Sequence, residues 1–114
     1  MLHTNLKHVL SADEHKKLIL ENENVMICCG RMGPMCIPVY AAMTELKNDY
    51  DKVVFADMEF DIPDAAVIRN APECRGFMGL PFVMYYKDGK LVHATSSIQS
   101  RLQIENILKK KLLK

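Results

Sequence analysis

The chain has 114 residues, of which 49% are hydrophobic and 25% charged, and its formal net charge is +1. That length suits one domain spanning 1–114, and the near-neutral charge gives no electrostatic case for binding nucleic acid. No run approaches 18 apolar residues, so we expect no membrane span. Residues 1–5 lack a basic start and an apolar leader, so we expect a cytoplasmic location.

The first half of the chain alternates strand and helix patterns. Residues 6–10 partly alternate, as in an edge strand, and Ser11 with Glu14 has the form of a capping box. A run of apolar residues suits a buried strand, and an apolar stripe at helical spacing follows it. The predicted elements are a strand at 6–10, a helix at 11–21, a strand at 25–29 and a helix whose stripe runs over 39–50.

The second half adds a hairpin and a last helix. Asp88-Gly89 between two apolar runs is a strong hairpin signal, and Ser100 with Gln103 is a second capping box. The predicted elements are a strand at 52–58, a short helix at 61–69, a loop at 71–80, strands at 81–86 and 90–95, and a helix from 100. The order β-α-β-α-β-α-β-β-α predicts an α/β fold, with a central mixed sheet and helices on both faces.

A cysteine lies where the second strand gives way to a helix. Gly30, Gly33 and Pro34 break the apolar run, and Cys36 follows at the start of the helix. Unpaired N–H groups and the helix dipole favour a thiolate at such a position. Cys36 is therefore a candidate nucleophile, although a buried cysteine that only fills space is the alternative.

The other cysteines and the histidines give no metal-binding pattern. Cys28, Cys29, Cys36 and Cys74 have no Cys-x-x-Cys spacing, and the four histidines are scattered. In a reducing compartment such cysteines are free or catalytic rather than a disulfide framework. We expect no metal and no cofactor.

Over nearly its whole length the chain resembles the thioredoxin family. The resemblance rests on the strand that leads to Asp61, the Gly79-Leu80-Pro81 step before a hairpin, and the start of the last helix at Ser100. It implies the thioredoxin fold, a cis peptide bond before Pro81, and a part in cell redox homeostasis through thiol–disulfide exchange.

The active-site stretch departs from the family pattern Trp-Cys-Gly-Pro-Cys. Counting back without gaps from Tyr50 puts Met32 on the tryptophan, Gly33 on the first cysteine and Cys36 on the second. A register that aligns Gly33-Pro34 with the family's Gly-Pro would replace both cysteines by methionine and delete one helical residue. Because that deletion rotates the apolar stripe by about 100°, we prefer the ungapped register.

In this register the attacking cysteine is absent and the resolving one is kept. Cys29 falls beside the active site and is a candidate resolving thiol for Cys36, whereas Cys28 faces the other way and suits the core. Cys74 is a secondary candidate, because Arg75 beside it would favour a thiolate. A surface or half-buried thiol without a redox role is the alternative for Cys74.

The buried aspartate of the family falls on Ile27. Asp57, on the next strand, is therefore a secondary candidate for an acid near Cys36, with a satisfied strand-end residue as the equal alternative. An Asp57→Asn substitution that left the ionisation of the Cys36 thiol unchanged would rule this role out.

The resemblance also implies a surface for an extended peptide. Met32 and Met35, with Met78, could form a soft, polarizable rim around the site, or could be core residues. The substrate-binding candidates are Met32, Gly33, Pro34, Met35, Leu80 and Pro81.

Two functions follow from these residues. The first is an atypical thiol–disulfide oxidoreductase, in which Cys36 exchanges with a protein or small-molecule disulfide and Cys29 or a small thiol resolves the mixed disulfide. The alternative is a non-catalytic module that binds peptides without redox turnover. Docking of the chain as a subunit, including as a homo-oligomer, is a third interpretation.

Overall fold

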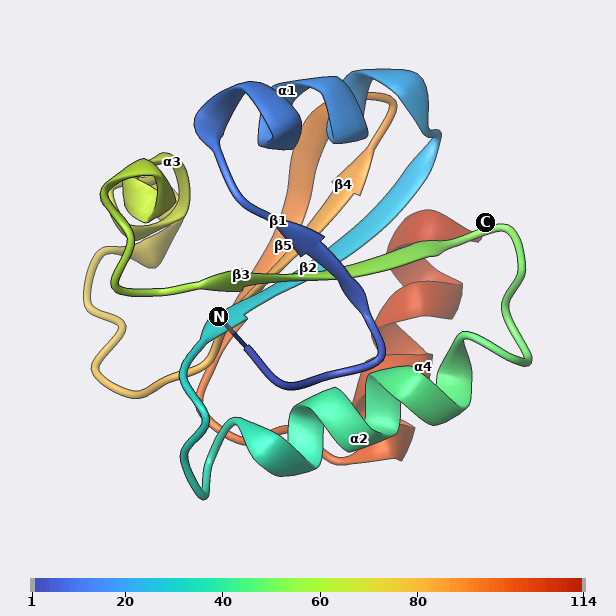
Figure 1. Ribbon diagram of the computed structural model, residues 1–114. Coiled ribbons are helices and arrows are strands. Elements are labelled where there is room, and N and C mark those ends of the chain that lie inside the picture. The colour runs from blue at the N-terminus through green and yellow to red at the C-terminus, as the bar shows by residue number, and fades with distance from the viewer. Residues whose placement is uncertain (1, 114) are drawn as a thin grey trace.

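A five-stranded mixed sheet forms the centre of the computed structural model, which describes residues 2–113 (Figure 1). The strand order is β1-β3-β2-β4-β5. The parallel part holds β1, β3 and β2, and β4 runs antiparallel to both β2 and β5. This confirms the predicted mixed sheet. The strands are β1 Lys7–Val9, β2 Asn24–Gly30, β3 Val54–Glu59, β4 Phe82–Lys87 and β5 Lys90–Ser96.

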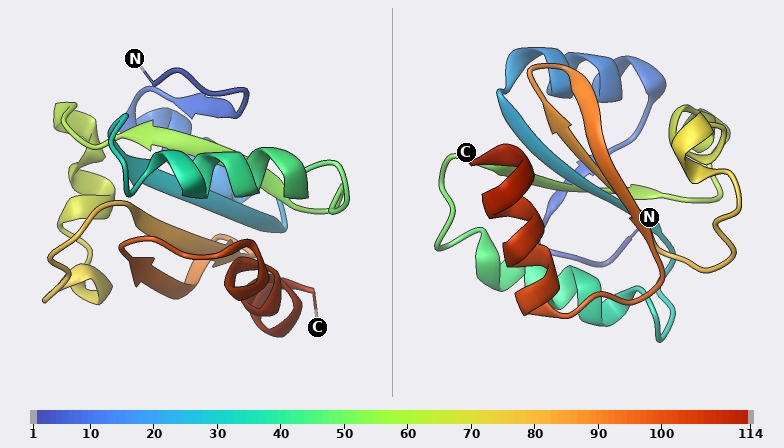
Figure 2. Two further views of the ribbon diagram at one scale, coloured as in Figure 1. Left: turned by 90° about the horizontal axis from the view of Figure 1, so that it is seen from below. Right: turned by 180° about the vertical axis from the view of Figure 1, so that it is seen from behind.

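Helices cover both faces of the sheet, as predicted (Figures 1 and 2). One face carries α1 and α3, and the other carries α2 and α4. The helices are α1 Ala12–Glu21, α2 Ile37–Leu46, α3 Ala66–Arg69 after a 3₁₀ turn at Pro63–Ala65, and α4 Arg101–Ile107, which continues as a π-helical turn at Leu108–Leu112. None of the helices within residues 2–113 is long and apolar enough to cross a membrane.

The helix boundaries follow local sequence signals, with two differences. The capping box at Ser100 is complete, but the Glu14 carboxylate accepts the N–H of Leu10 rather than that of the cap residue Ser11. Helix α2 ends at Leu46 although the apolar stripe continues to Tyr50. The intervening Asn48-Asp49 pair favours turns, because these side chains compete for backbone hydrogen bonds.

Two hydrophobic clusters fill the space between the sheet and its helices. Alternate residues of β2 enter different clusters, because successive side chains of a strand point to opposite faces. Met26 and Cys28 pack on the face covered by α2 and α4, which we call the α2–α4 face. Ile27 and Cys29 pack on the face covered by α1 and α3, the α1–α3 face. The two adjacent cysteines therefore lie in separate halves of the core.

Candidate functional site

Cys36 lies at the N-terminus of α2. After β2 ends at Gly30, the chain turns so that the N–H groups of Cys36 and Ile37 both donate to the carbonyl oxygen of Gly33, at 3.1 and 3.0 Å. Cys36 is the N-cap residue, and Pro38 occupies the first turn, where its missing N–H costs nothing. The sequence prediction of a thiol at a strand-to-helix junction is thus confirmed.

The thiol of Cys36 is enclosed by backbone and side chains. The N–H of Arg31 donates to Sγ at 3.4 Å, and only 2% of the residue is exposed. A Cβ atom placed on Gly30 would lie 2.7 Å from this sulfur, 2.9 Å from the hydroxyl oxygen of Tyr40 and 3.1 Å from Cβ of Pro81. Only glycine fits at position 30, because three groups meet above it.

The Leu80–Pro81 peptide bond is cis, and Pro81 is buried beside the thiol. Preceding it, the carbonyl oxygen of Gly79 accepts the N–H of Ser97 at 3.2 Å. Leu80 is half-buried. The loop before β4 is thereby held next to the start of α2, which places the peptide-binding candidates of both segments at one end of the molecule.

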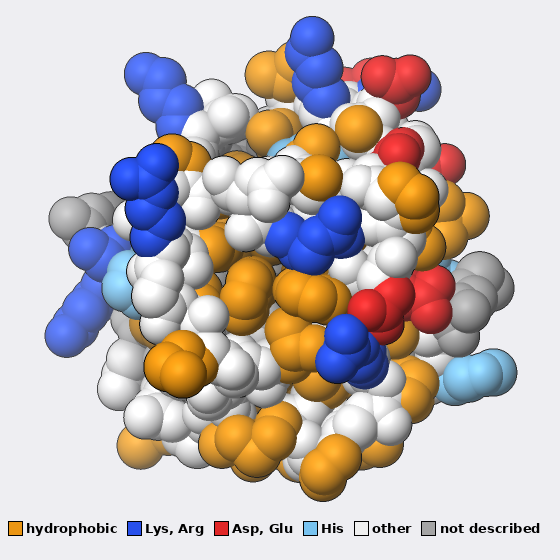
Figure 3. All heavy atoms as spheres, turned by 90° about the vertical axis from the view of Figure 1, so that its left-hand side faces the viewer, with side chains coloured by type: hydrophobic (Ala, Val, Ile, Leu, Met, Phe, Trp, Pro, Cys, Tyr) orange, Lys and Arg blue, Asp and Glu red, His pale blue; other side chains and the backbone are white. Residues whose placement is uncertain are grey.

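The turn before α2 presents its side chains to solvent. Met32, Pro34 and Met35 are exposed and Gly33 is half-buried. Figure 3 shows this end of the molecule, where hydrophobic side chains gather among a few charged ones. The bidentate ion pair between Arg31 and Asp61 lies beside them.

Three methionines that the sequence placed either in the core or around the site are exposed. Met32, Met35 and Met78 are 41%, 43% and 97% exposed. The methionines of the strands and of the middle of α2 are instead fully buried: Met26, Met43, Met58 and Met84. The core interpretation of the first three is therefore wrong. The Met32 thioether accepts the backbone N–H of His3 at 3.4 Å, and all three side chains are exposed enough to contact a partner.

Cys29 and Cys36 are not brought together. Cys29 is fully buried on the α1–α3 face, whereas Cys36 packs on the α2–α4 face with Cys28. Burial raises the pKa of Cys29 to about 12 and that of Cys28 well above its ordinary value. All four cysteines are free thiols. This corrects the expectation that Cys29 resolves a disulfide at Cys36, because the sheet separates their side chains.

Cys74 belongs to the same half of the core as Cys29. It is buried, and its Sγ lies 3.8 Å from Sδ of Met84. Burial, and then the nearby Glu73, raise the pKa of the Cys74 thiol. The expected thiolate-favouring effect of Arg75 is therefore overturned.

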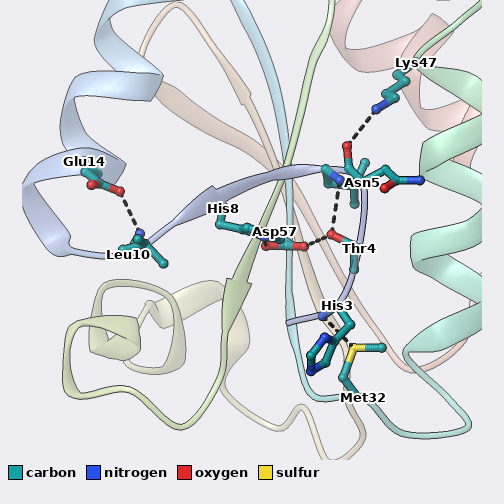
Figure 4. A network of polar contacts seen from close by, with 10 residues as sticks. His3, Thr4, Asn5, His8, Leu10, Glu14, Met32, Lys47 and Asp57 are labelled. Carbon is teal, nitrogen blue, oxygen red and sulfur yellow. Dashed lines mark hydrogen bonds and ion pairs between the residues drawn. The ribbon is translucent and has the colours of Figure 1, made fainter. Parts of the chain in front are cut away.

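Asp57 is buried on β3 and is bound by two side chains of the N-terminal segment (Figure 4). Its carboxylate accepts the hydroxyl of Thr4 and lies 2.6 Å from Nδ1 of His8. Thr4 in turn accepts the N–H of Leu6 at 3.1 Å. These bonds satisfy the carboxylate, and they tie the first residues of the chain to the sheet. A role for Asp57 in the chemistry of Cys36 stays a prediction.

Tyr40 is a residue of the site that the sequence did not single out. It is 3% exposed, and among residues 2–113 its hydroxyl has no hydrogen-bond partner. The sequence contains one signal that could have identified it. Tyr40 lies four residues after Cys36, and this spacing puts both side chains on one side of the helix. No group of three or more metal-binding side chains occurs within the described residues.

Comparisons with known proteins bear on the fold. No protein-family model and no curated protein matches the sequence. Plasmodium falciparum thioredoxin superposes with a TM-score of 0.74 at 23% identity, covering 92% of this chain and 99% of that one. Oxidised mitochondrial thioredoxin 3 of Saccharomyces cerevisiae gives 0.75 at 23% identity, covering 91% and 93%. Thioredoxin f2 of Chlamydomonas reinhardtii gives 0.75 at 12% identity, covering 96% and 100%. The chain therefore has the thioredoxin fold.

Proposed function

We propose that this protein is a thioredoxin-like oxidoreductase that exchanges thiols and disulfides through one cysteine, Cys36. The observation that supports this best is the position of its sulfur, at the N-terminus of α2, accepting the N–H of Arg31 and lying beside Pro81. A helix N-terminus, with a backbone N–H that donates to the sulfur, is the kind of position that suits a nucleophilic thiolate in exchange.

The exchange takes place in three balanced steps. The Cys36 thiolate attacks one sulfur of the partner's disulfide; a new S–S bond forms at Cys36, and the other partner sulfur leaves as a thiolate. A small thiolate of the glutathione class then attacks the partner's sulfur in the mixed disulfide; an S–S bond forms between the partner and the small thiol, and Cys36 leaves as a thiolate. A second molecule of the small thiol attacks that bond, which frees the partner's thiol and leaves the small thiol as its own disulfide. The small thiol acts as the resolving thiol, because Cys29 lies on the opposite face of the sheet and cannot reach Cys36.

The partner binds along the exposed rim at this end of the molecule. Met32 and Met35 offer polarizable contacts on one side, and the Leu80–Pro81 step lies on the other. An extended peptide is the ligand that such a surface suits, because backbone contacts can fix its direction while the thioethers adapt to its side chains.

A binding module without redox turnover is the second candidate function. Two observations favour it. Only 2% of Cys36 is exposed, and position 33, where the family pattern has its attacking cysteine, is a glycine. Such a module would use the same rim and leave the thiol unused.

One assay separates the two functions. A peptide disulfide is incubated with excess glutathione, and its reduction is followed with wild-type protein and with Cys36→Ala. The oxidoreductase predicts acceleration by wild type, none by Cys36→Ala, and unchanged acceleration by Cys29→Ala. Binding of the peptide by both wild type and Cys36→Ala, with no acceleration by either, would instead establish the binding module.

A further inference from the structure

A buried hydroxyl lies close to the sulfur of Cys36. The hydroxyl oxygen of Tyr40 and the sulfur of Cys36 lie 2.9 and 2.7 Å from one point, the position of a Cβ atom on Gly30. Tyr40 is only 3% exposed, and its hydroxyl makes no hydrogen bond within residues 2–113. A buried hydroxyl left unpaired is costly, so its presence calls for an explanation.

We propose that Tyr40 is the hydrogen-bond donor that stabilises the Cys36 thiolate. The phenol O–H and the backbone N–H of Arg31 would together bind the ionised sulfur, in a pocket that glycine at position 30 keeps open. This inference rests on the proposed use of Cys36 as a nucleophile.

The two acidic positions considered near the thiol do not supply this interaction. The acid that the resemblance placed beneath the thiol is Ile27 here, and the Asp57 carboxylate is taken by Thr4 and His8. Hydrogen bonds to an ionised group are stronger than those to a neutral one. In this structure the Tyr40 hydroxyl makes no hydrogen bond to the sulfur, so the proposed bond requires a small shift of the phenol or of Cys36 when the thiol ionises.

The phenol remains a donor over the working pH range. Burial raises the pKa of Tyr40 well above its usual value, and nearby Cys28, Cys36, Asp57 and Cys29 raise it further. No proton passes from Tyr40 to the sulfur. The thiol releases its proton to water, and the phenol donates a hydrogen bond to the sulfur that remains.

The titratable groups around Tyr40 come from three elements. Cys28 and Cys29 belong to β2, Cys36 begins α2, and Asp57 belongs to β3 and is paired with His8 of β1. A titration must therefore follow Cys36 itself rather than the total thiol content. Cysteine labelled with ¹³C at Cβ gives a separate signal for each residue, and Cys36→Ala assigns the one that matters.

The test compares Tyr40→Phe with Tyr85→Phe. Tyr85 is a matched control. Its hydroxyl is also buried, has no hydrogen-bond partner within residues 2–113 and lies on the α2–α4 face, but on β4 beside Cys28. Tyr40→Phe should move the midpoint of the Cys36 ionisation up by about one pH unit, as expected for one lost charge-assisted hydrogen bond. Tyr85→Phe should leave the midpoint in place.

An identical midpoint in wild type and Tyr40→Phe would overturn the inference, as would a wild-type Cys36 that does not ionise below the pH of unfolding. Loss of the fold is not expected, since each substitution removes only an unpaired hydroxyl. The titration needs no partner, so its outcome is separate from that of the exchange assay. A shifted midpoint without peptide reduction would uphold the donor and reject the oxidoreductase.

Discussion

Cys29 and Cys36 lie on opposite faces of the central sheet, with Cys29 in the cluster beneath α1 and α3 and Cys36 in the cluster beneath α2 and α4. The backbone of β2 stands between the two side chains. A disulfide needs its Cα atoms within about 7 Å and its Cβ atoms directed at each other. The pair therefore cannot act as the dithiol of the site.

Mild oxidation with diamide should accordingly yield no Cys29–Cys36 disulfide. Peptide mapping by mass spectrometry after digestion under non-reducing conditions checks this. Cys29→Ala should exchange at the wild-type rate, because the residue only fills the core of the α1–α3 face. Recovery of a linked peptide containing both cysteines would contradict the separation seen here.

Gly33→Cys should convert the site into a dithiol. A side chain at position 33 meets nothing within 4 Å, and two residues would then separate the new thiol from Cys36. Because attack within one molecule replaces a bimolecular step, turnover in an insulin-reduction assay should rise by roughly tenfold or more. Gly33→Ala is the control and should show the wild-type rate. If the variant cannot be oxidised to a bond between positions 33 and 36, Cys36 does not occupy the resolving position.

Much of the fold could be predicted from local signals. The capping box at Ser100 and the Asp88-Gly89 turn each depend on residues within a few positions of one another, and both are where the sequence placed them. The β2 strand is a nearly continuous apolar run and β3 is mostly apolar, with Asp57 and Glu59 as its charged residues, as expected for strands that are covered on both sides. The end of α2 was missed, because the apolar stripe outlasts the helix.

The candidate site was predicted less completely, since its contacts are long-range. The period of a strand shows that Cys28 and Cys29 diverge, but which of them faces α2 depends on how the helix crosses the sheet. The partners of Asp57 are Thr4 and His8, which lie 53 and 49 residues earlier in the sequence. No local sequence pattern predicts such contacts.

Gly30→Ala should destabilise the fold. Its methyl group would lie closer to the Cys36 sulfur and the Tyr40 hydroxyl than packed atoms tolerate, and it would make a tight contact with Pro81. Overpacking of this kind costs about 1–3 kcal/mol, which urea denaturation followed by circular dichroism would measure. Gly33→Ala is the matched substitution in open space and should cost little or nothing. Equal stability of the two variants would contradict the crowding above position 30.

Stability should fall as the pH drops through the range in which histidine titrates. Burial lowers the pKa of His15, whose Nε2 lies 2.9 Å from the hydroxyl oxygen of Tyr86. The unfolded chain, with an ordinary pKa near 6.5, therefore binds more protons than the folded one, and the free energy of unfolding rises with pH in this window. His93, whose pKa burial also lowers, acts in the same direction.

Urea denaturation at a series of pH values between about 5 and 7.5 would measure this slope. His15→Gln should flatten the slope of the unfolding free energy against pH, because the variant lacks the buried imidazole whose protonation opposes folding. The control His3→Gln, at an exposed position, should keep the wild-type slope. A slope that persists unchanged in His15→Gln would show that another group causes it.

The capacity of Cys36 to form a mixed disulfide is tested most directly by mass spectrometry. The native protein is incubated with glutathione disulfide, quenched with acid and mapped by peptide digestion. The structure predicts a single glutathione adduct on Cys36, absent from Cys36→Ala and present in Cys29→Ala. No adduct, or one confined to Cys28, Cys29 or Cys74, would contradict the assignment of Cys36 as the exchanging thiol.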